Sequence, residues 1–384
     1  MTAYDAILLA GFGGPEGQED VIPFLRNVTR GRGIPEERLE EVARHYRHFG
    51  GISPINAQNR ALRAALEAEL ERRGVDLPVL WGNRNWAPYL PGVIAEAHAN
   101  GRNRLLAIAT SAYSSYSGCR QYREDFAEAL SATGLEGQVQ IDKVRQFFDH
   151  PGFVTPFITG VRKGLADVAA AVPGIDLVTE VEVLFSTHSI PMTDAARSGP
   201  AERGFGEGGA YAAQHLAVAH AIMAGTTAPQ PATATLTEPV PAAGPVETPW
   251  QLVYQSRSGP PSMPWLEPDI NDAIALLPAR GIRAVVIVPL GFVSDHMEVM
   301  WDLDNEATES AAEHGLFSVR VPTPGVDPAF VSGLVDLVLE RVQDAPEAAR
   351  PAMTELGPWY DVCRPACCEN VRLGFKPAVA GIAP

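Results

Sequence analysis

The sequence predicts an α/β protein with two doubly wound, Rossmann-like domains, each built on a parallel sheet of four strands. Two observations support this prediction. Short apolar runs alternate with segments of helical periodicity along both halves of the chain, a pattern typical of parallel strands joined by crossover helices. The length of 384 residues leaves room for two such units.

The first half is predicted to form a domain over residues 1–150. Apolar runs predict its strands at residues 6–9, 79–80, 105–109 and 139–144. Pro35 opens a predicted helix that continues to Phe49 with apolar residues at helical spacing. A second helix is predicted over residues 56–73, and Gly74 ends it.

The second half, a predicted domain over residues 151–345, repeats this rhythm. Its strands are predicted at residues 181–185, 252–254, 284–289 and 319–321. Its helices are predicted at residues 211–223, 269–277 and 330–342. Two small doubly wound domains favour a ligand site in a cleft between them.

Two segments depart from this pattern. Residues 224–248 are rich in Pro, Thr and Ala and hold almost no bulky apolar side chain. Such a segment cannot bury enough surface to offset its ordering entropy, so a flexible insertion is predicted. Residues 346–384 form a tail rich in Pro, Gly and Cys, which we expect to pack back on the first domain.

The composition narrows the class of function. A net charge of -16 argues against a nucleic-acid partner, because phosphate binding needs surplus Lys and Arg. No apolar run reaches membrane-spanning length, and the longest, residues 284–293, is interrupted by Pro289 and Gly291. The N-terminal residues contain no cationic leader, so a cytoplasmic protein is expected. Cysteines in that compartment are free or metal-bound rather than disulfide-linked.

His188 follows closely on the strand predicted at residues 181–185. Ligands of open parallel sheets bind beyond the carboxyl ends of the strands. A histidine at this place can take up a proton near neutral pH or hold a metal ion. The alternative is a loop histidine whose ring is satisfied by backbone groups, and the sequence leaves it open.

Three carboxylates, Glu298, Asp302 and Glu306, recur every four residues after the strand at residues 284–289. In a helix they would line one face. One interpretation is a solvated acidic face, with the first carboxylate favoured by the helix dipole. The other is a ladder that passes cations or protons into a cleft, and His188 at the neighbouring sheet edge favours it.

Several segments of the chain resemble ferrochelatase signatures and follow the order of that family from about residue 6 to about residue 345. They are GGISP (50–54), GNRNW (82–86), YSSYS (113–117), FSTHSIPM (185–192), QSRSG (255–259), PWLEP (264–268) and GFVSDHMEVMWDLDNEA (291–307). The insertion and the tail are covered least. The tail and the stretch YSSYSGCRQYRED are most similar to actinobacterial members, whose substrate is coproporphyrin III.

The resemblance implies the chelatase fold and the insertion of Fe²⁺ into coproporphyrin III, which gives coprohaem in haem biosynthesis. His188 matches the proton acceptor and iron ligand of the family, and Glu298 matches the second ligand or proton acceptor opposite it. Free histidine, with a pKa of about 6.5, suits proton uptake at physiological pH. Asp302 and Glu306 match an acidic ridge that leads away from the centre.

The resemblance also implies residues that bind the porphyrin. Arg30 and Arg32 are candidates for its propionates because guanidinium pairs bidentately with carboxylate; a solvated basic turn is the alternative. Ser53 matches a position that hydrogen-bonds a propionate, and Tyr122 matches a tyrosine that contacts porphyrin. Phe12 stands where some relatives have a tyrosine that ligates product iron, so an axial oxygen ligand must come from elsewhere.

Some ferrochelatases hold a [2Fe–2S] cluster with one internal and three C-terminal cysteines. Cys119, Cys363, Cys367 and Cys368 agree with this count and layout, and four thiolates are the usual ligand set. Their C-x3-C-C spacing differs from the animal C-x2-C-x4-C, and adjacent ligands are geometrically awkward. Unligated thiols are the alternative. A cluster would fasten the tail to the first domain.

Three other functions remain open on this scaffold. They are a protoporphyrin chelatase, a cobalt chelatase, and a non-catalytic haem carrier or iron–sulfur sensor. A carrier would need neither a base nor an acidic ladder, which weighs against it. The expected partners are coproporphyrin III and ferrous iron, with a downstream enzyme of the haem pathway as a further candidate.

Overall fold

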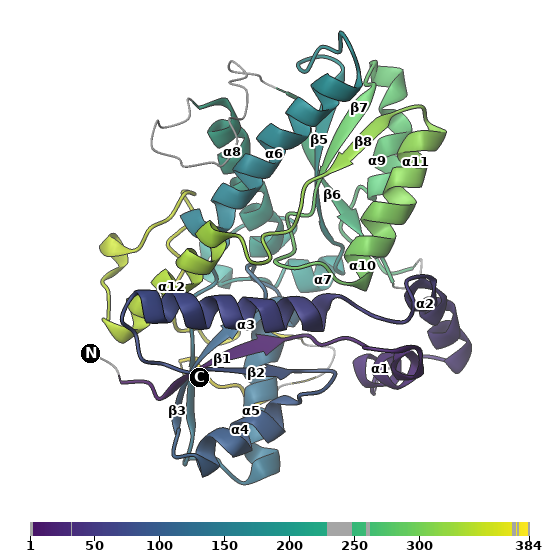
Figure 1. Cartoon of the computed structure of the whole chain (residues 1–384). Helices are drawn as coiled ribbons and strands as arrows, with labels where there is room; N and C mark the ends of the chain where they lie inside the picture. Colours follow the sequence, from purple (N-terminus) through teal and green to yellow (C-terminus); the bar gives the residue numbers. More distant parts are fainter. Residues whose placement is uncertain are drawn as a thin grey trace.

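The computed structural model describes residues 3–31, 33–228, 248–258, 262–370, 374 and 376–382. It confirms the predicted fold class, since two sheets of four parallel strands are surrounded by helices (Figure 1). The sheet of the first half lies below that of the second half in Figure 1. Among the described helices, none combines the length and the apolar character that crossing a membrane requires.

Each of the eight predicted strands is present. The first sheet contains β1 (Ala6–Gly11), β2 (Val79–Asn83), β3 (Arg104–Ala109) and β4 (Gln140–Lys143). The second sheet contains β5 (Val181–His188), β6 (Trp250–Gln255), β7 (Ala284–Val288) and β8 (Phe317–Arg320). Several strands extend beyond the apolar runs that predicted them, because their last residues are polar but still pair with the neighbouring strand.

The helices of the first half are α1 (Val21–Val28), α2 (Glu36–His48), α3 (Ile55–Arg72), α4 (Leu90–Ala99) and α5 (Gln121–Thr133). Those of the second half are α6 (Pro151–Ala171), α7 (Met192–Ala195), α8 (Gly209–Thr227), α9 (Ile270–Leu276), α10 (Met297–Val299), α11 (Thr308–Glu313) and α12 (Pro328–Val342). Two π-helices, Tyr116–Arg120 and Met300–Ala307, interrupt the regular elements.

The two sheets share one topology. The strand order is β2-β1-β3-β4 in the first sheet and β6-β5-β7-β8 in the second. In each sheet, the second strand in sequence lies on one side of the first strand, and the third and fourth strands lie on its other side. The loops after β5 and β7 therefore diverge at the carboxyl edge, which is where open α/β sheets bind ligands.

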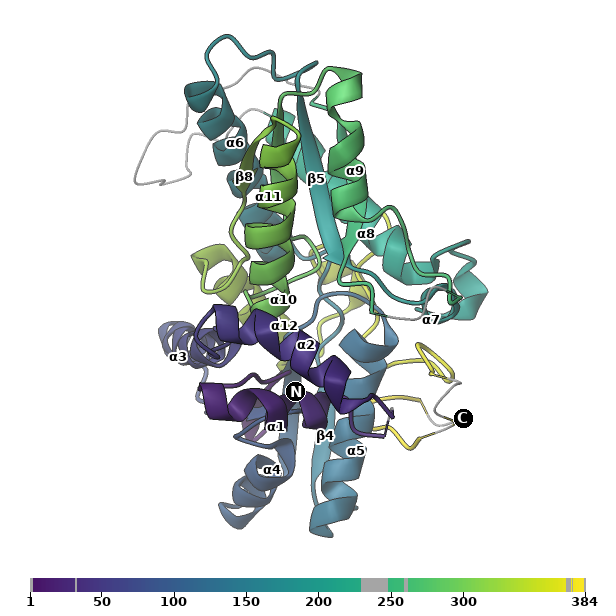
Figure 2. The same cartoon turned by 90° about the vertical axis from the view of Figure 1, so that its right-hand side faces the viewer.

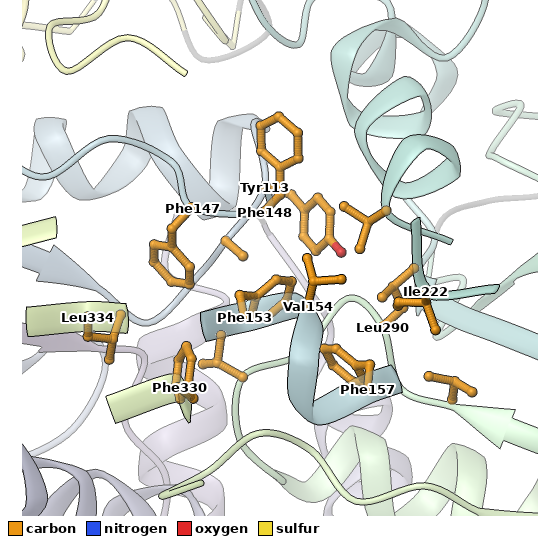
Figure 3. Close-up of a cluster of buried hydrophobic side chains, with 14 of the residues drawn as sticks. Tyr113, Phe147, Phe148, Phe153, Val154, Phe157, Ile222, Leu290, Phe330 and Leu334 are labelled. Carbon is orange, nitrogen blue, oxygen red and sulfur yellow. The ribbon is translucent and has the colours of Figure 1, made fainter. Parts of the chain in front are cut away.

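The inner faces of both sheets contribute to one shared core. Alternation along the strands directs Ile7 and Leu9 of β1, and Val183 and Phe185 of β5, into the same hydrophobic cluster. Aromatic rings fill the space between the halves, with Phe153 of α6 packed edge-on against Phe157 at 5.3 Å between ring centroids (Figure 3). The outer face of each sheet has its own smaller cluster.

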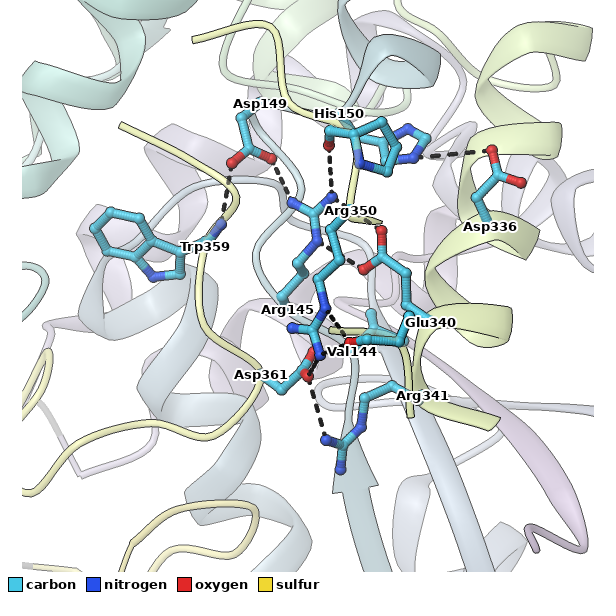
Figure 4. Close-up of polar contacts among 12 residues, drawn as sticks. Val144, Arg145, Asp149, His150, Asp336, Glu340, Arg341, Arg350, Trp359 and Asp361 are labelled. Atoms are coloured by element: carbon cyan, nitrogen blue, oxygen red, sulfur yellow. Dashed lines mark hydrogen bonds and ion pairs between the residues drawn. The ribbon is translucent and has the colours of Figure 1, made fainter. Parts of the chain in front are cut away.

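Helix α12 belongs by sequence to the predicted second domain, yet it packs against both α6 and α3. Arg73, the residue that follows α3, pairs with Asp336 of α12 at 2.5 Å. The buried Arg145, just after β4, pairs with Glu340 of α12 at 2.8 Å and with Asp149 at 2.5 Å (Figure 4). The boundary predicted at residue 150 therefore assigns to the second half a helix that packs against both halves.

The C-terminal tail lies beside α5 (Figure 2). Arg123 of α5 donates from Nε to the carbonyl of Val379 at 2.7 Å and accepts at its own carbonyl from the Val379 amide at 3.1 Å. The tail also contacts the second half, where Arg364 pairs with Glu202 at 3.2 Å. It therefore bridges the two halves as well as covering the first.

The insertion was predicted to begin at residue 224. This start is too early, because α8 continues to Thr227. Arg162 of α6 caps the end of the helix, donating to the carbonyls of Gly225 at 2.6 Å and Thr226 at 3.2 Å. Thr248, at the other end of the predicted insertion, is buried. Residues 229–247 lie outside the described residues.

Candidate functional site

His188 is the last residue of β5 and the only one in that strand that is not fully buried. Its Nδ1 lies 2.5 Å from the carbonyl oxygen of Ser189. Because a carbonyl oxygen only accepts, Nδ1 carries the proton, and the lone pair of the neutral ring is on Nε2. The side chain is about a third exposed, so Nε2 is accessible to a ligand.

Glu298 of α10 lies opposite this nitrogen. Its Oε2 is 3.7 Å from Nε2 of His188, and its side chain is 51% exposed. The segment that carries it follows β7 and passes very close to β5 at Gly291, where a Cβ would lie 2.2 Å from Oγ1 of Thr187. Glycine at this position allows the loop after β7 to bring Glu298 to the end of β5.

The segment after Glu298 differs from the α-helix expected there. Met300–Ala307 form a π-helix with i→i+5 hydrogen bonds, between α10 and α11. The sequence could not distinguish the two, because a spacing of four residues stays near one face in either. π-helical turns are rare and occur frequently at functional sites.

Asp302 lies within this π-helix and is coupled to both other carboxylates of the ladder. Burial, together with the negative charges of Glu298 and Glu306, raises its pKa to about 7, against the lowering effect of hydrogen bonds from Ser256 and Gln255. Glu306 accepts a hydrogen bond from Nε1 of Trp301 at 2.7 Å. The structure therefore brings His188, Glu298, Asp302 and Glu306 together.

Gln255, the last residue of β6, connects the two sides of the site. The side chain is buried; its Oε1 accepts from Oγ of Ser186 at 2.7 Å, and its Nε2 donates to Asp302 Oδ2 at 3.2 Å and to the Glu298 carbonyl at 3.3 Å. Its own carbonyl accepts from the Ser189 amide at 2.7 Å. Sequence reasoning placed Gln255 only within a family signature, because a neutral amide carries no signal of its own.

The first half contributes to the same site through α2. His45 stacks on Trp301 of the π-helix, with ring centroids 4.0 Å apart and planes at 4°. Tyr46 is close to Glu298: burial and the carboxylate charge raise the pKa of the Tyr46 hydroxyl well above its usual value. Neither residue was predicted, because their packing depends on how the two halves meet.

The residues predicted to bind porphyrin occupy different places in the first half. Phe12 follows β1 and is 36% exposed. Ser53 is buried, and its amide donates to the carbonyl of Pro15 at 2.9 Å. The Tyr122 ring is buried beneath the guanidinium of Arg84, 4.0 Å from its centroid.

Of the two arginines predicted to bind propionates, the structure describes only Arg30. Arg30 is exposed on the surface and donates to Oδ1 of Asn27 at 2.7 Å. Arg32 lies outside the described residues.

The four cysteines are buried and free of disulfides, and each thiol interacts with the next in the order Cys119, Cys363, Cys367 and Cys368. Sγ of Cys119 lies 4.0 Å from Sγ of Cys363, and Sγ of Cys367 lies 3.7 Å from Sγ of Cys368. Within the described ranges, no group of three or more His, Cys, Asp or Glu side chains is placed to hold a single metal ion. A binuclear cluster instead takes two thiolates on each iron, and two pairs fit that requirement.

The adjacent pair is made possible by its backbone. Cys368 has a φ of 59° and Ala366 a φ of 60°, a left-handed conformation that is uncommon for residues other than glycine. Sγ of Cys368 accepts from the Gly199 amide at 3.2 Å, and Sγ of Cys367 lies 3.0 Å from the hydroxyl of Tyr360. Such conformations cost free energy and are found mainly at functional sites.

A cavity of about 730 Å³ lies elsewhere, between β4, α5 and the tail. Neither His188 nor Glu298 is among the described residues that line it. Its lining mixes both signs of charge, including Arg104, Arg341 and Asp361. This cavity is therefore separate from His188 and Glu298.

Two doubly wound domains, with an imidazole and a carboxylate facing each other at the topological switch point, define a class of α/β protein that can exchange a proton or a metal ion there. A family model described as Ferrochelatase matches residues 4–342. The chain belongs to the ferrochelatase family.

Two relatives of high sequence identity support this membership. The coproporphyrin III ferrochelatase of Leifsonia xyli subsp. xyli is 68% identical over 392 residues, covering 100% of this chain and 95% of that protein. The coproporphyrin III ferrochelatase of Tropheryma whipplei (strain Twist) is 58% identical over 383 residues, covering 100% and 93%. Among solved structures, SirB from Bacillus subtilis with Fe3+ has a TM-score of 0.47 at 11% identity, covering 89% of this chain and 98% of that chain.

Proposed function

We propose that this protein inserts Fe²⁺ into coproporphyrin III to give coprohaem and two protons. The observation that carries the proposal is the pair formed by Nε2 of His188 and Oε2 of Glu298, 3.7 Å apart at the carboxyl edge of the second sheet. The names of the similar proteins support coproporphyrin III as the substrate.

His188 and Glu298 would take complementary parts in this reaction. The porphyrin loses two pyrrole N–H protons as the metal enters. Nε2 of His188 offers a lone pair for one proton, since Nδ1 is held by the Ser189 carbonyl. The carboxylate of Glu298 offers the second acceptor. Before transfer, the same two atoms can hold Fe²⁺ loosely, because two protein ligands leave positions open for the macrocycle.

Asp302 and Glu306 would carry protons or cations away from this pair. A carboxyl group with a pKa of about 7 exchanges protons readily near neutral pH, and Asp302 has that value. The amide of Gln255 holds Asp302 next to the backbone of Glu298. The ladder therefore provides successive acceptors along the π-helix.

The porphyrin is expected to lie between this pair and the first half. Phe12, Ser53 and Tyr122 remain the predicted contacts to the macrocycle, and Arg30 and Arg32 the predicted partners of its propionates. Arg30 is exposed and tied only to neutral Asn27 within the described residues, so its charge is available to a carboxylate.

The four cysteines fit a resident [2Fe–2S] cluster, which we infer as the cofactor. Cys119 with Cys363, and Cys367 with Cys368, would each hold one iron. When bound, such a cluster supplies one-electron redox chemistry. The cysteines come from the π-helix Tyr116–Arg120 and from the tail, and Cys368 also contacts Gly199 of the second half. Free thiols also agree with the cytoplasmic location, which remains a prediction.

Anaerobic incubation with Fe²⁺ and each porphyrin in turn tests the proposed function. We expect coproporphyrin III to show the absorbance change of metallation, and protoporphyrin or Co²⁺ to react more slowly. Metallation of protoporphyrin or insertion of Co²⁺ at the higher rate would assign the protein to one of the alternative chelatases. Binding of porphyrin without metallation would favour the carrier.

A further inference from the structure

Four cationic side chains are buried among the described residues, namely Arg120, Arg123, Lys143 and Arg145. Two of them have carboxylate partners. Arg120 pairs with Glu124 at 2.8 Å, and Arg145 pairs with Asp149 at 2.5 Å. Arg123 and Lys143, which are 3% and 5% exposed, form no ion pair within the part of the chain that the structure describes. Removing an unpaired charge from water costs several kcal/mol.

The hydrogen bonds of these two cations do not balance their charge. Nζ of Lys143 donates to the carbonyl of Val144 at 2.9 Å and to Oε1 of Gln146 at 2.5 Å. Nε of Arg123 donates to the carbonyl of Val379 at 2.7 Å, whereas its Nη1 is buried with no partner among the described residues. All of these acceptors are neutral oxygens.

Both cations lie within electrostatic range of the cysteines. The positive charges of Lys143 and Arg123 act on the Cys119 thiol, and that of Arg123 acts also on Cys363. The tail closes over Arg123 at Gly381, where a Cβ would lie 1.9 Å from Nη2. The fold therefore brings these two cations and the four thiols into one buried region.

We propose that Arg123 and Lys143 are the counter-charges of the four-cysteine centre and set its reduction potential. Two ferric ions, two sulfides and four thiolates together form a dianion, which two fixed cations balance. This inference rests on the proposed cluster. One-electron reduction adds a further negative charge, so loss of either cation destabilises the reduced form more than the oxidised form.

The test uses the full chain purified anaerobically, as wild type and as Arg123→Gln, Arg123→Lys and Lys143→Gln. Iron, acid-labile sulfide and the visible spectrum measure cluster content, and titration with dithionite measures the midpoint potential. For Arg123→Gln and Lys143→Gln we expect the equilibrium to shift about tenfold toward the oxidised form, or about 59 mV lower for one electron. Arg123→Lys retains the charge and is expected to stay near the wild-type potential.

The outcomes separate this inference from the proposed cluster. Wild-type protein without iron and sulfide, even after reconstitution, would overturn the cluster and the inference together. A wild-type cluster with unchanged potentials in both glutamine variants would overturn the inference alone. If Arg123→Gln loses the cluster, retention in Arg123→Lys supports the charge requirement, and loss in both variants refutes it for Arg123. Lys143→Gln then remains as the independent measurement.

Discussion

The site depends at the residue scale on which nitrogen of His188 carries its proton. The Ser189 carbonyl holds the proton on Nδ1, so Nε2 is left to accept one from the porphyrin. The backbone around His188 is fixed as well, because the hydroxyl of Tyr211 donates to the His188 carbonyl at 2.8 Å. The imidazole is therefore oriented before any substrate binds.

Replacing His188 tests this assignment directly. We expect His188→Ala to slow iron insertion by about 10²- to 10⁴-fold, the usual contribution of a positioned acid or base, while coproporphyrin still binds. Rates of metallation and quenching of tryptophan fluorescence measure the two effects. His314→Ala, at an exposed position, is the matched control. Unchanged turnover in His188→Ala would remove His188 from the mechanism.

Asp302 leads to a second prediction, which concerns how the free energy of unfolding depends on pH. Its pKa is raised from the ordinary carboxyl value to about 7, so the folded state holds a proton that the unfolded state releases near pH 4. The free energy of unfolding therefore falls as pH rises from about 4 to 7. We expect Asp302→Asn to remove this loss of stability, because the amide does not titrate. Its oxygen can still accept hydrogen bonds from Ser256 and Gln255.

We expect Asp302→Asn to melt at a higher temperature than wild type at pH 8, with a smaller difference at pH 5. Thermal melts followed by circular dichroism at both pH values provide the measurement. The same variant should lose iron insertion, as expected of a group whose ionisation serves function at the expense of stability. An equal shift in melting temperature at the two pH values would contradict the raised pKa.

At the scale of elements, the sequence predicted the strands better than the helices. Each run of buried apolar residues marks a strand, because a strand buried on both faces carries that pattern itself. The π-helix was not predicted, since Glu298, Asp302 and Glu306 have a spacing that suits either helix. Helix α6 was not predicted from the sequence either, and it contains Pro156.

His150 caps the N-terminus of helix α6, and protonation of its imidazole would remove this cap. Nδ1 of His150 accepts from the Gly152 amide at 3.0 Å, and this requires the neutral ring. Burial lowers the pKa of His150 to about 4, with the positive charge of Arg145 contributing in the same direction. The unfolded state takes up this proton near pH 6.5, so stability is lost as pH falls from about 6.5 to 4.

His150→Asn should separate the cap from the titration. Asparagine caps helices well, so stability at pH 7 is expected to stay within about 1 kcal/mol of wild type. At pH 4 the variant should gain on the order of 3 kcal/mol relative to wild type, at about 1.4 kcal/mol per pKa unit. Urea midpoints at pH 7, 5.5 and 4 measure the trend. If wild type and His150→Asn lose stability equally as the pH falls, His150 is not the source of the pH dependence.

At the scale of the whole molecule, the sequence did not show how the halves join. Amphipathic periodicity predicted α12 but not that it would cover α3 and α6 at once. The cysteine count predicted a cross-linked tail, whereas its contacts with Glu202 and Gly199 depend on tertiary packing. Arg123, Lys143 and Gln255 gave no signal, because only burial distinguishes them from surface residues of the same type.

The buried ion pair between Arg145 and Glu340 leads to a prediction for the whole molecule. Glu340→Gln leaves a fully buried guanidinium with one carboxylate, and we expect a loss on the order of 3 kcal/mol. Calorimetry should show one transition that moves as a whole, because both sheets contribute to one core. Asp167→Asn, which breaks an exposed pair with Lys163, should cost less than about 1 kcal/mol. Separate melting of the halves would contradict the shared core.

The packing of α12 on α3 has a consequence for synthesis on the ribosome. The apolar face of the first half is covered in part by residues 328–342, which are translated after the strands of both sheets. A nascent chain that has completed only its first sheet therefore exposes that face while the second half emerges. Independent folding of the N-terminal unit, common in multidomain chains, is not expected here, and chaperone binding during elongation should be prolonged.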